Sequence, residues 1–185
     1  FEHAIAMDLA FPTDQEINAA NGALEISGSI SGPGALIKNG SETVTLSGTN
    51  TYSGGTTVSS GTLAGTTDSL QGMITNNGMV SFDQSSVGTY AGDMSGSGSM
   101  EKAGNGSVTL SGNNSYSGGT ALEAGTLEVA SGNALGSGSL TLNGGELLVQ
   151  SYAEMKGNLG LGGNLAWNNA TIAFYDTEES PEAND

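Results

Sequence analysis

One segment of the chain occurs twice, and this repeat is the feature that most restricts the possible folds. Residues 28–63 return as residues 92–127 at a constant offset of 64 residues, with no gap between the copies. Each copy contains a Val-Thr-Leu-Ser-Gly run, then Asn-x-Tyr-Ser-Gly-Gly-Thr, and closes on Gly-Thr-Leu. A long ungapped period built from short apolar segments and glycine turns is typical of a stacked solenoid rather than of a globular enzyme core.

From residue 22 onward the sequence repeats one short pattern, in which two apolar residues flank one small or polar residue and a Gly/Asn/Ser turn follows. Residues two apart in a strand share a face, so each apolar pair points its side chains to one side. No stretch after residue 20 has the apolar spacing of a helix, and the pattern predicts an all-β chain. The pairs are Leu24/Ile26, Val44/Leu46, Val80/Phe82, Val108/Leu110, Leu127/Val129, Leu140/Leu142, Leu147/Val149, Leu159/Leu161, Leu165/Trp167 and Ile172/Phe174.

The turns between these pairs are predicted to use residues that accept a positive φ angle. They include Ser47-Gly48, Gly54-Gly55, Asn77-Gly78, Ser111-Gly112, Gly118-Gly119, Asn143-Gly144-Gly145 and Asn168-Asn169.

Short strands with one apolar face can form a sandwich, an up-and-down barrel or a β-helix. The constant offset favours a right-handed parallel β-helix, because a stacked coil does not accept the loop insertions that hairpins tolerate. A coil of roughly 20–25 residues makes the offset about three coils. We therefore expect seven or eight coils, with Leu110 about three rungs above Leu46.

Charge and composition exclude several functions. The chain of 185 residues has 3 Lys and Arg against 19 Asp and Glu, which gives a net charge of −16. Nucleic-acid backbones and anionic membrane surfaces both require clustered cations, which this chain lacks. It has no cysteine, so disulfides and thiolate metal sites are excluded.

The sequence shows no apolar run of transmembrane length, and residues 1–20 lack the basic start of a signal peptide. Because the chain opens on Phe1 and closes on Asp185, we interpret it as a piece of something larger.

Three regions are expected along the chain. Residues 1–20 are an N-terminal junction or capping segment, in which Ala4, Ile5, Leu9 and Phe11 would pack against the first coil. Residues 21–175 form the β-helix. Residues 176–185 are an acidic tail or loop with one proline. Such a tail is either a solvated end or a shield that keeps further strands from adding to the last coil.

The repeat resembles the passenger-associated transport repeat of Gram-negative autotransporters, also called the autotransporter-associated β-strand repeat. Ile30, Gly32, Gly34, Leu36, Lys38 and Gly40 match the opening of the family pattern. Val44-Thr45-Leu46-Ser47-Gly48, Asn50 to Thr56 and Gly61-Thr62-Leu63 match the rest of it. The second copy fits with mild departures at Met94, Met100 and Ser115, and residues 136–145 give a looser echo.

The resemblance implies a right-handed parallel β-helix in a passenger exported through its own outer-membrane barrel, which would lie outside this chain. It also implies a place at the bacterial cell surface or among secreted proteins, in a stalk associated with transport rather than catalysis. We expect no cofactor, a mostly monomeric segment, and host-surface or sister-cell molecules as partners of the whole protein.

Two places in the sequence are candidates for catalysis. His3 is the sole histidine and would have to serve any hydrolytic triad, but no Gly-x-Ser-x-Gly elbow accompanies it. Asp68, Asp83 and Asp93 lie between the copies and could share a face, as in β-helices that cleave polysaccharides. Scattered carboxylates with few cations are typical of solvated surface, so no catalytic or metal residue is predicted.

Other recurring residues have structural explanations. The run Ser95 to Gly98 lacks the Gly-Lys-Ser ending of a phosphate loop, and Gly54-Gly55-Thr56 lacks the later positions of a calcium nonapeptide. Asn50 and Asn114 are expected to bind backbone groups in turns.

Structural roles are also predicted for the aromatic residues. Tyr52 and Tyr116 are expected to pack at coil corners, with a sugar-stacking platform as the alternative. Trp167 is expected in the core, with an exposed binding aromatic as the alternative.

The sequence thus predicts a non-catalytic β-helical passenger segment that supports secretion and surface display as part of an adhesin. Two alternatives remain. One is the stem behind an upstream protease or lipase domain, and the weaker one is a β-helix polysaccharide-cleaving enzyme.

Overall fold

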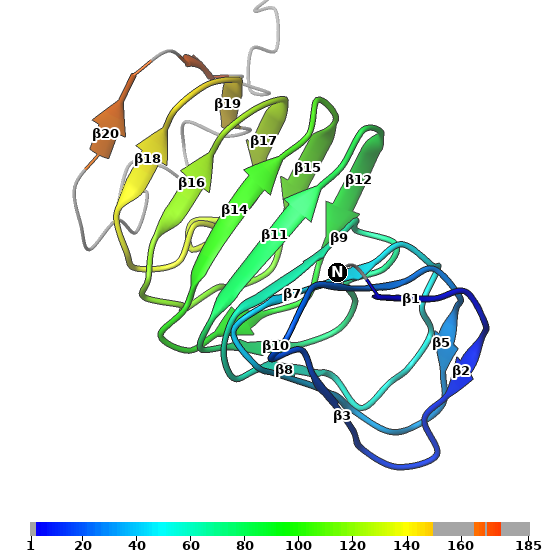
Figure 1. The fold of residues 1–185 in the computed structure, drawn as a ribbon. Helices are drawn as coiled ribbons and strands as arrows, with labels where there is room; N and C mark the ends of the chain where they lie inside the picture. The colour runs from blue at the N-terminus through cyan, green and yellow to red at the C-terminus, as the bar shows by residue number, and fades with distance from the viewer. Residues whose placement is uncertain (1–2, 150–164, 169, 175–185) are drawn as a thin grey trace, which may run out of the picture.

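The computed structural model describes residues 3–149, 165–168 and 170–174, and its paired strands all run parallel. Coils of about 20 residues, such as the step from Met100 to Thr120, stack into a solenoid of about seven turns (Figure 1). The expected all-β parallel β-helix is confirmed. The described residues contain no helix, and so none that could cross a membrane.

Four parallel sheets make up the walls. Sheet A has nine strands: β1 (His3–Ile5), β4 (Leu24–Ile26), β7 (Thr43–Leu46), β9 (Thr62–Gly65), β11 (Met79–Asp83), β14 (Ser99–Ala103), β16 (Thr120–Leu122), β18 (Leu140–Leu142) and β20 (Leu165–Trp167). Sheet C holds β3 (Gln15–Asn18), β6 (Leu36–Asn39), β8 (Thr56–Val58), β10 (Ile74–Asn76) and β13 (Met94–Ser95). Sheet D holds β12 (Val87–Tyr90), β15 (Ser107–Leu110), β17 (Thr126–Val129), β19 (Glu146–Val149) and β21 (Thr171–Phe174). Sheet B pairs β2 (Leu9–Ala10) with β5 (Ile30–Ser31).

Each coil has three sides. The chain passes through sheet A, then sheet B or sheet D, then the side occupied by sheet C, and returns to sheet A one rung higher. Figure 1 shows the N-terminal coils as a ring with β1, β2 and β3 on its three sides. Sheets B and D are the lower and upper parts of one side, separated by two passes without a strand, residues 47–55 and 66–73.

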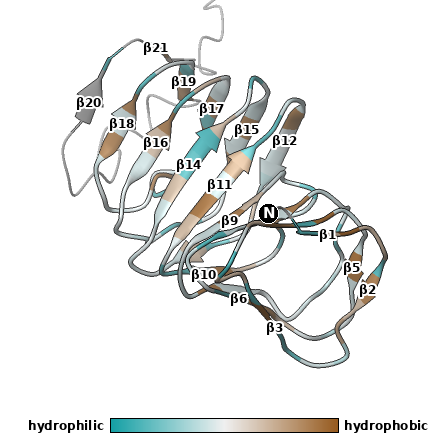
Figure 2. Cartoon of the chain, in the orientation of Figure 1, coloured by the Kyte–Doolittle hydropathy of each residue, from teal (hydrophilic) through white to brown (hydrophobic). Residues whose placement is uncertain are grey.

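The interior is filled by one residue in every two along each strand. In sheet A the register stacks Val44, Leu63, Val80 and Met100 in one column, and all four side chains are buried. Figure 2 shows the corresponding alternation of hydropathy along the strands. Burial of these ladders is the main favourable term in folding, at roughly 25 cal/mol for each Å² of apolar surface removed from water.

The two repeat copies lie on different sides of the solenoid, which corrects the expected position of Leu110. Leu46 pairs with Gly65, Gly65 with Phe82 and Phe82 with Lys102, so Lys102 lies three rungs above Leu46. Leu110 is in sheet D, between Tyr90 and Val129.

Short coils explain the difference. The three steps from Leu46 to Lys102 are 19, 17 and 20 residues, 56 in all, so the 64-residue offset covers three coils and one further side of eight residues. Strands β6 and β7 of the first copy, in sheets C and A, therefore correspond to β14 and β15 in sheets A and D.

The N-terminal region forms the first coil of the solenoid. Strands β1, β2 and β3 pair with the second coil in the same parallel register as later strands. Phe11 is buried, and Ile5 and Leu9 pack against the core, whereas the side chain of Ala4 is exposed. Leu159, Leu161 and the acidic tail 176–185 lie outside the described residues.

Glycines serve the turns in two ways. Gly55, Gly119 and Gly145 have positive φ angles, as predicted. Gly48 does not, and it is required instead because a β-carbon there would lie 2.3 Å from the carbonyl oxygen of Gly28 in the coil below. Close stacking of turns, rather than φ alone, thus selects glycine.

Candidate functional site

The residues shared by the two copies converge on three buried polar arrangements, which we call the polar bridges. They consist of a lysine, an asparagine and a tyrosine–threonine pair in each copy: Lys38, Asn50, Tyr52 and Thr56, and then Lys102, Asn114, Tyr116 and Thr120. Among the described residues, every buried side-chain nitrogen and oxygen atom has a hydrogen-bond partner.

Each asparagine joins three coils. Asn50 Oδ1 accepts a hydrogen bond from Ile30 N at 2.8 Å, and its Nδ2 donates to Ser69 O at 2.8 Å. Asn114 repeats this with Met94 N at 2.7 Å and Ala134 O at 2.6 Å. The prediction that these asparagines bind backbone groups is confirmed, and their amides link the coil below to the coil above.

Each lysine lies inside the solenoid and caps turn carbonyls. Lys38 Nζ donates to Asn39 O at 3.0 Å and Gly40 O at 2.9 Å, and also to Ser60 O of the next coil at 3.0 Å. Lys102 Nζ donates at 2.7, 2.8 and 3.1 Å to the equivalent oxygens of residues 103, 104 and 124.

Desolvation is the main electrostatic effect on these ammonium groups. It lowers the pKa of Lys38 and Lys102, and the nearby carboxylates of Glu42 and Asp83 act in the opposite direction. Sequence analysis missed this role. The available signal was that both cations of the repeat recur at one position in a chain that has only three.

Each tyrosine packs inside a coil and bonds the threonine four residues later. The Tyr52 and Tyr116 hydroxyls lie 2.6 Å from the Oγ1 atoms of Thr56 and Thr120, and both rings are buried. Burial raises the pKa of both tyrosines, with the hydrogen bond opposing it. The structure confirms packing and leaves neither ring exposed as a sugar platform.

Two further sets of buried residues were not predicted. After each copy the chain makes a tight turn that buries a leucine, Leu70 or Leu135. Their spacing is 65 residues rather than 64, so the repeat pattern did not extend to them. Between the copies, Gln84 is buried and joins Thr67 N at 2.9 Å to the carbonyl of Ser107 at 3.3 Å.

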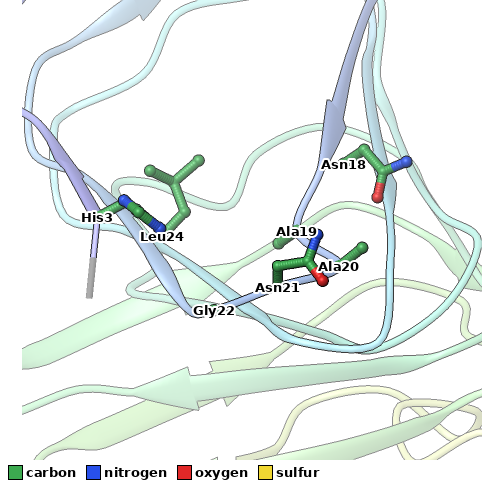
Figure 3. Close-up of a pocket in the computed structure, with 7 residues that line it drawn as sticks. All are labelled: His3, Asn18, Ala19, Ala20, Asn21, Gly22 and Leu24. Carbon is green, nitrogen blue, oxygen red and sulfur yellow. The ribbon is translucent and has the colours of Figure 1, made fainter. Parts of the chain in front are cut away.

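The residues considered for catalysis are not brought together. His3 is exposed on β1 and borders a depression of about 470 Å³ at the first coil, with Asn18, Asn21 and Leu24 around it (Figure 3). Asp83 and Asp93 lie beyond opposite ends of β12.

The other candidate residues of the sequence do not form a catalytic or metal site either. Asp68 lies in the turn after β9. Among the described residues, no group of three or more His, Cys, Asp or Glu side chains is arranged to hold a metal ion. Trp167 pairs through its backbone with Leu142, and its side chain lies outside the described part.

Comparison with known proteins identifies the repeat. The family model of the passenger-associated-transport-repeat matches residues 36–64 and 100–129. The chain carries two passenger-associated transport repeats. Their matched ranges contain both lysines, both asparagines and both tyrosine–threonine pairs of the polar bridges.

The chain is also similar to an adhesin. It is 43% identical over 99 residues to the adhesin BmaC autotransporter of Brucella suis biovar 1 (strain 1330). That alignment covers 50% of this chain and 3% of the adhesin. No solved structure matches the chain.

Proposed function

We propose that the chain is a non-catalytic stalk within an autotransporter passenger, which supports export and surface display as part of an adhesin. Its similarity to an adhesin autotransporter and its two passenger-associated transport repeats support this assignment. The partner in export would be an outer-membrane barrel outside this chain, and the place of action the bacterial cell surface.

The observation that carries the proposal is which residues the two copies share. The polar bridges are identical, and the buried differences are apolar for apolar, as in Ile30 and Met94 or Val58 and Leu122. Several differences at outward positions replace a side chain by one of another chemical class. Ile37 becomes Glu101, and Ser59 becomes Glu123.

The second copy is displaced from the first by one side of the solenoid, and this displacement supports the same conclusion. Equivalent outward residues of the two copies face different directions, so a flat ligand cannot meet both copies in the same way. The copies preserve what stacks the coils rather than a common outer surface. Vectorial stacking of such coils outside the cell would help draw the chain out and would hold an adhesive region away from the membrane.

A secretion assay tests this function in the full-length protein. Replacing both asparagines, Asn50→Leu and Asn114→Leu, should lower the amount of protease-resistant passenger at the cell surface severalfold at equal synthesis. The matched controls exchange outward residues between the copies, Ile37→Glu and Thr57→Ala, and should leave display unchanged. Normal display of the asparagine variant, or loss of display in the controls, would contradict the proposal.

A further inference from the structure

Strand β12 is the lower end of sheet D, and it lies in the middle of the solenoid. Figure 1 shows it as the first strand of the row β12, β15, β17 and β19. Among the described strands, only β15 pairs with it. That ladder uses one residue in two, among them Tyr90, whose carbonyl oxygen accepts a hydrogen bond from Ser111 N at 3.1 Å. The amide and carbonyl groups of Val87 and Thr89 therefore point the other way, toward the coil below.

These four backbone groups form an open strand edge. No hydrogen bond within the described structure engages them. The chain below, residues 66–72, makes a tight turn instead of a strand. This turn runs on the inner side of the rung, because Leu70 is buried and Thr67 Oγ1 would lie 2.0 Å from an inward β-carbon at Gly88. The edge therefore faces solvent, and the side chain of Val87 is 82% exposed.

The other two described strands that end a sheet inside the rod are covered. At β5, Ile30 N donates to Asn50 Oδ1 at 2.8 Å, and Ile30 O accepts a hydrogen bond from Thr51 N at 2.8 Å. At β13, the amide and carbonyl groups of Met94 are engaged in the same way by residues 114–115. Both covers belong to the passenger-associated transport repeats. No repeat segment covers the lower edge of β12.

The turn below β12 is joined to this coil by side chains alone. Gln84 Oε1 accepts a hydrogen bond from Thr67 N at 2.9 Å, and the Tyr90 hydroxyl donates to Gly72 O at 2.8 Å. Both of these bridging side chains are buried. They hold the two coils together without using the open edge, which leaves it available to a strand from another molecule.

Carboxylates surround the open edge. Asp83 and Asp93 are exposed beyond the two ends of β12, and Asp68 is exposed in the turn below. Among the described residues, no lysine or arginine is exposed to balance them. The edge therefore repels other copies of this chain, which has a net charge of −16, and attracts a strand that carries positive charge.

We propose that the open edge of β12 binds a cationic peptide segment in extended conformation, which adds to sheet D as one further strand. Its backbone would bond the free groups of Val87 and Thr89, and its lysine or arginine side chains would pair with the three surrounding aspartates. The contact is short, so we expect dissociation constants of about 0.1–1 mM for a short peptide. The site is independent of the stalk function, because none of its groups belongs to the polar bridges.

Backbone NMR of the chain with a probe peptide, N-acetyl-Lys-Thr-Lys-Val-Lys-Thr-amide, gives the first test. The peptide should shift the amide signals of Val87 and Thr89 and slow their hydrogen exchange severalfold. Gly88 and Tyr90, whose amides face β15, should change little. The same peptide methylated on every backbone nitrogen keeps its charge but should bind at least about tenfold more weakly. Unchanged signals at Val87 and Thr89, or equal binding of the methylated peptide, would overturn the proposal.

A proline variant tests the edge itself. Val87→Pro removes one donor from the open edge without touching the ladder to β15, so the urea midpoint should hold while peptide binding weakens at least about tenfold. The matched control Val87→Thr keeps the amide and should bind the peptide as the unmodified chain does. Undiminished binding by a folded Val87→Pro chain would refute strand addition at β12.

Charge variants separate the site from a general effect of an acidic surface, and they do not depend on how well the proline is tolerated. The variant Asp68→Asn, Asp83→Asn and Asp93→Asn should bind the probe peptide about tenfold more weakly at low salt. Its control neutralises three exposed carboxylates of the first coils: Glu16→Gln, Glu25→Gln and Glu42→Gln. The control should bind nearly as well as the unmodified chain, and equal weakening of both variants would contradict a site at β12.

Discussion

At the scale of single residues, the buried lysines are the least expected feature of the molecule. Taking an ammonium group out of water is costly, and no carboxylate hydrogen-bonds to Lys38 or Lys102 in the described structure. Three carbonyl oxygens replace the lost water, one of them from the next coil. The lysine thus closes its own turn and fastens the coil above, while its long apolar stem fills the interior.

The effect of removing a single lysine on the stability of the chain should be measurable. Lys102→Met keeps the length of the stem but leaves three carbonyls without their donor, so the free energy of unfolding should fall by about 2 kcal/mol in urea titration. Lys38→Met should behave in the same way, and the exposed Thr75→Ser should change stability little. An unchanged or more stable Lys102→Met would show that the cost of burying the charge exceeds the value of its hydrogen bonds.

At the scale of elements, the corners of the solenoid differ in how closely they stack. A β-carbon at Gly106, between β14 and β15, would lie 2.2 Å from the carbonyl oxygen of Ser86 in the coil below. A β-carbon at Gly72 or Gly132, in the turns that follow the repeats, would meet nothing within 4 Å. Stacked turns fix the coil length, and the two open turns are where it can vary.

Single-residue insertions should separate the two kinds of corner. A glycine inserted after Gly72 should cost less than about 0.5 kcal/mol, because the open turn has room for it. A glycine inserted after Gly104 should cost several times more, since it must either break the stacked turn or shift the following strand by one residue, which turns its buried side chains outward. Urea midpoints of both variants measure the difference, and equal midpoints would contradict this account of the corners.

At the scale of the whole molecule, charge is divided between inside and outside. Two of the three cationic residues, Lys38 and Lys102, are buried, and the third, Lys156, lies outside the described residues. Among the described residues, the outer surface carries carboxylates on sheets A, C and D, and no lysine or arginine is exposed. Such a surface favours solubility and works against the compact state through self-repulsion.

Added salt should therefore stabilise the chain. Raising sodium chloride from about 0.02 M to about 0.3 M shortens the screening length severalfold and should raise the urea midpoint at about pH 7.5. A Glu16→Gln and Glu146→Gln variant should show a smaller rise, because it has less repulsion to screen. A midpoint that falls with salt would mean that attractive charge pairs dominate this surface.

The sequence by itself determined the fold class and the inward residues, because both follow from a period of two along short strands. Pairs such as Val44/Leu46 and Leu127/Val129 could be placed in the core with no knowledge of the coil path. The roles of Asn50 and Tyr52 also followed from their place in turns and coil corners.

Only the tertiary structure decided which side of the solenoid each strand joins. That depends on the exact length of every coil, and steps of 19, 17 and 20 residues from Leu46 to Lys102 left the second copy one side further on. It also decided the fate of Lys38 and Lys102, since a lysine in a sequence signals a charged surface until the carbonyls that enclose it are seen. Periodicity is local and can be found in the sequence, whereas the groups that meet across a coil are set by the sum of all the turns between them.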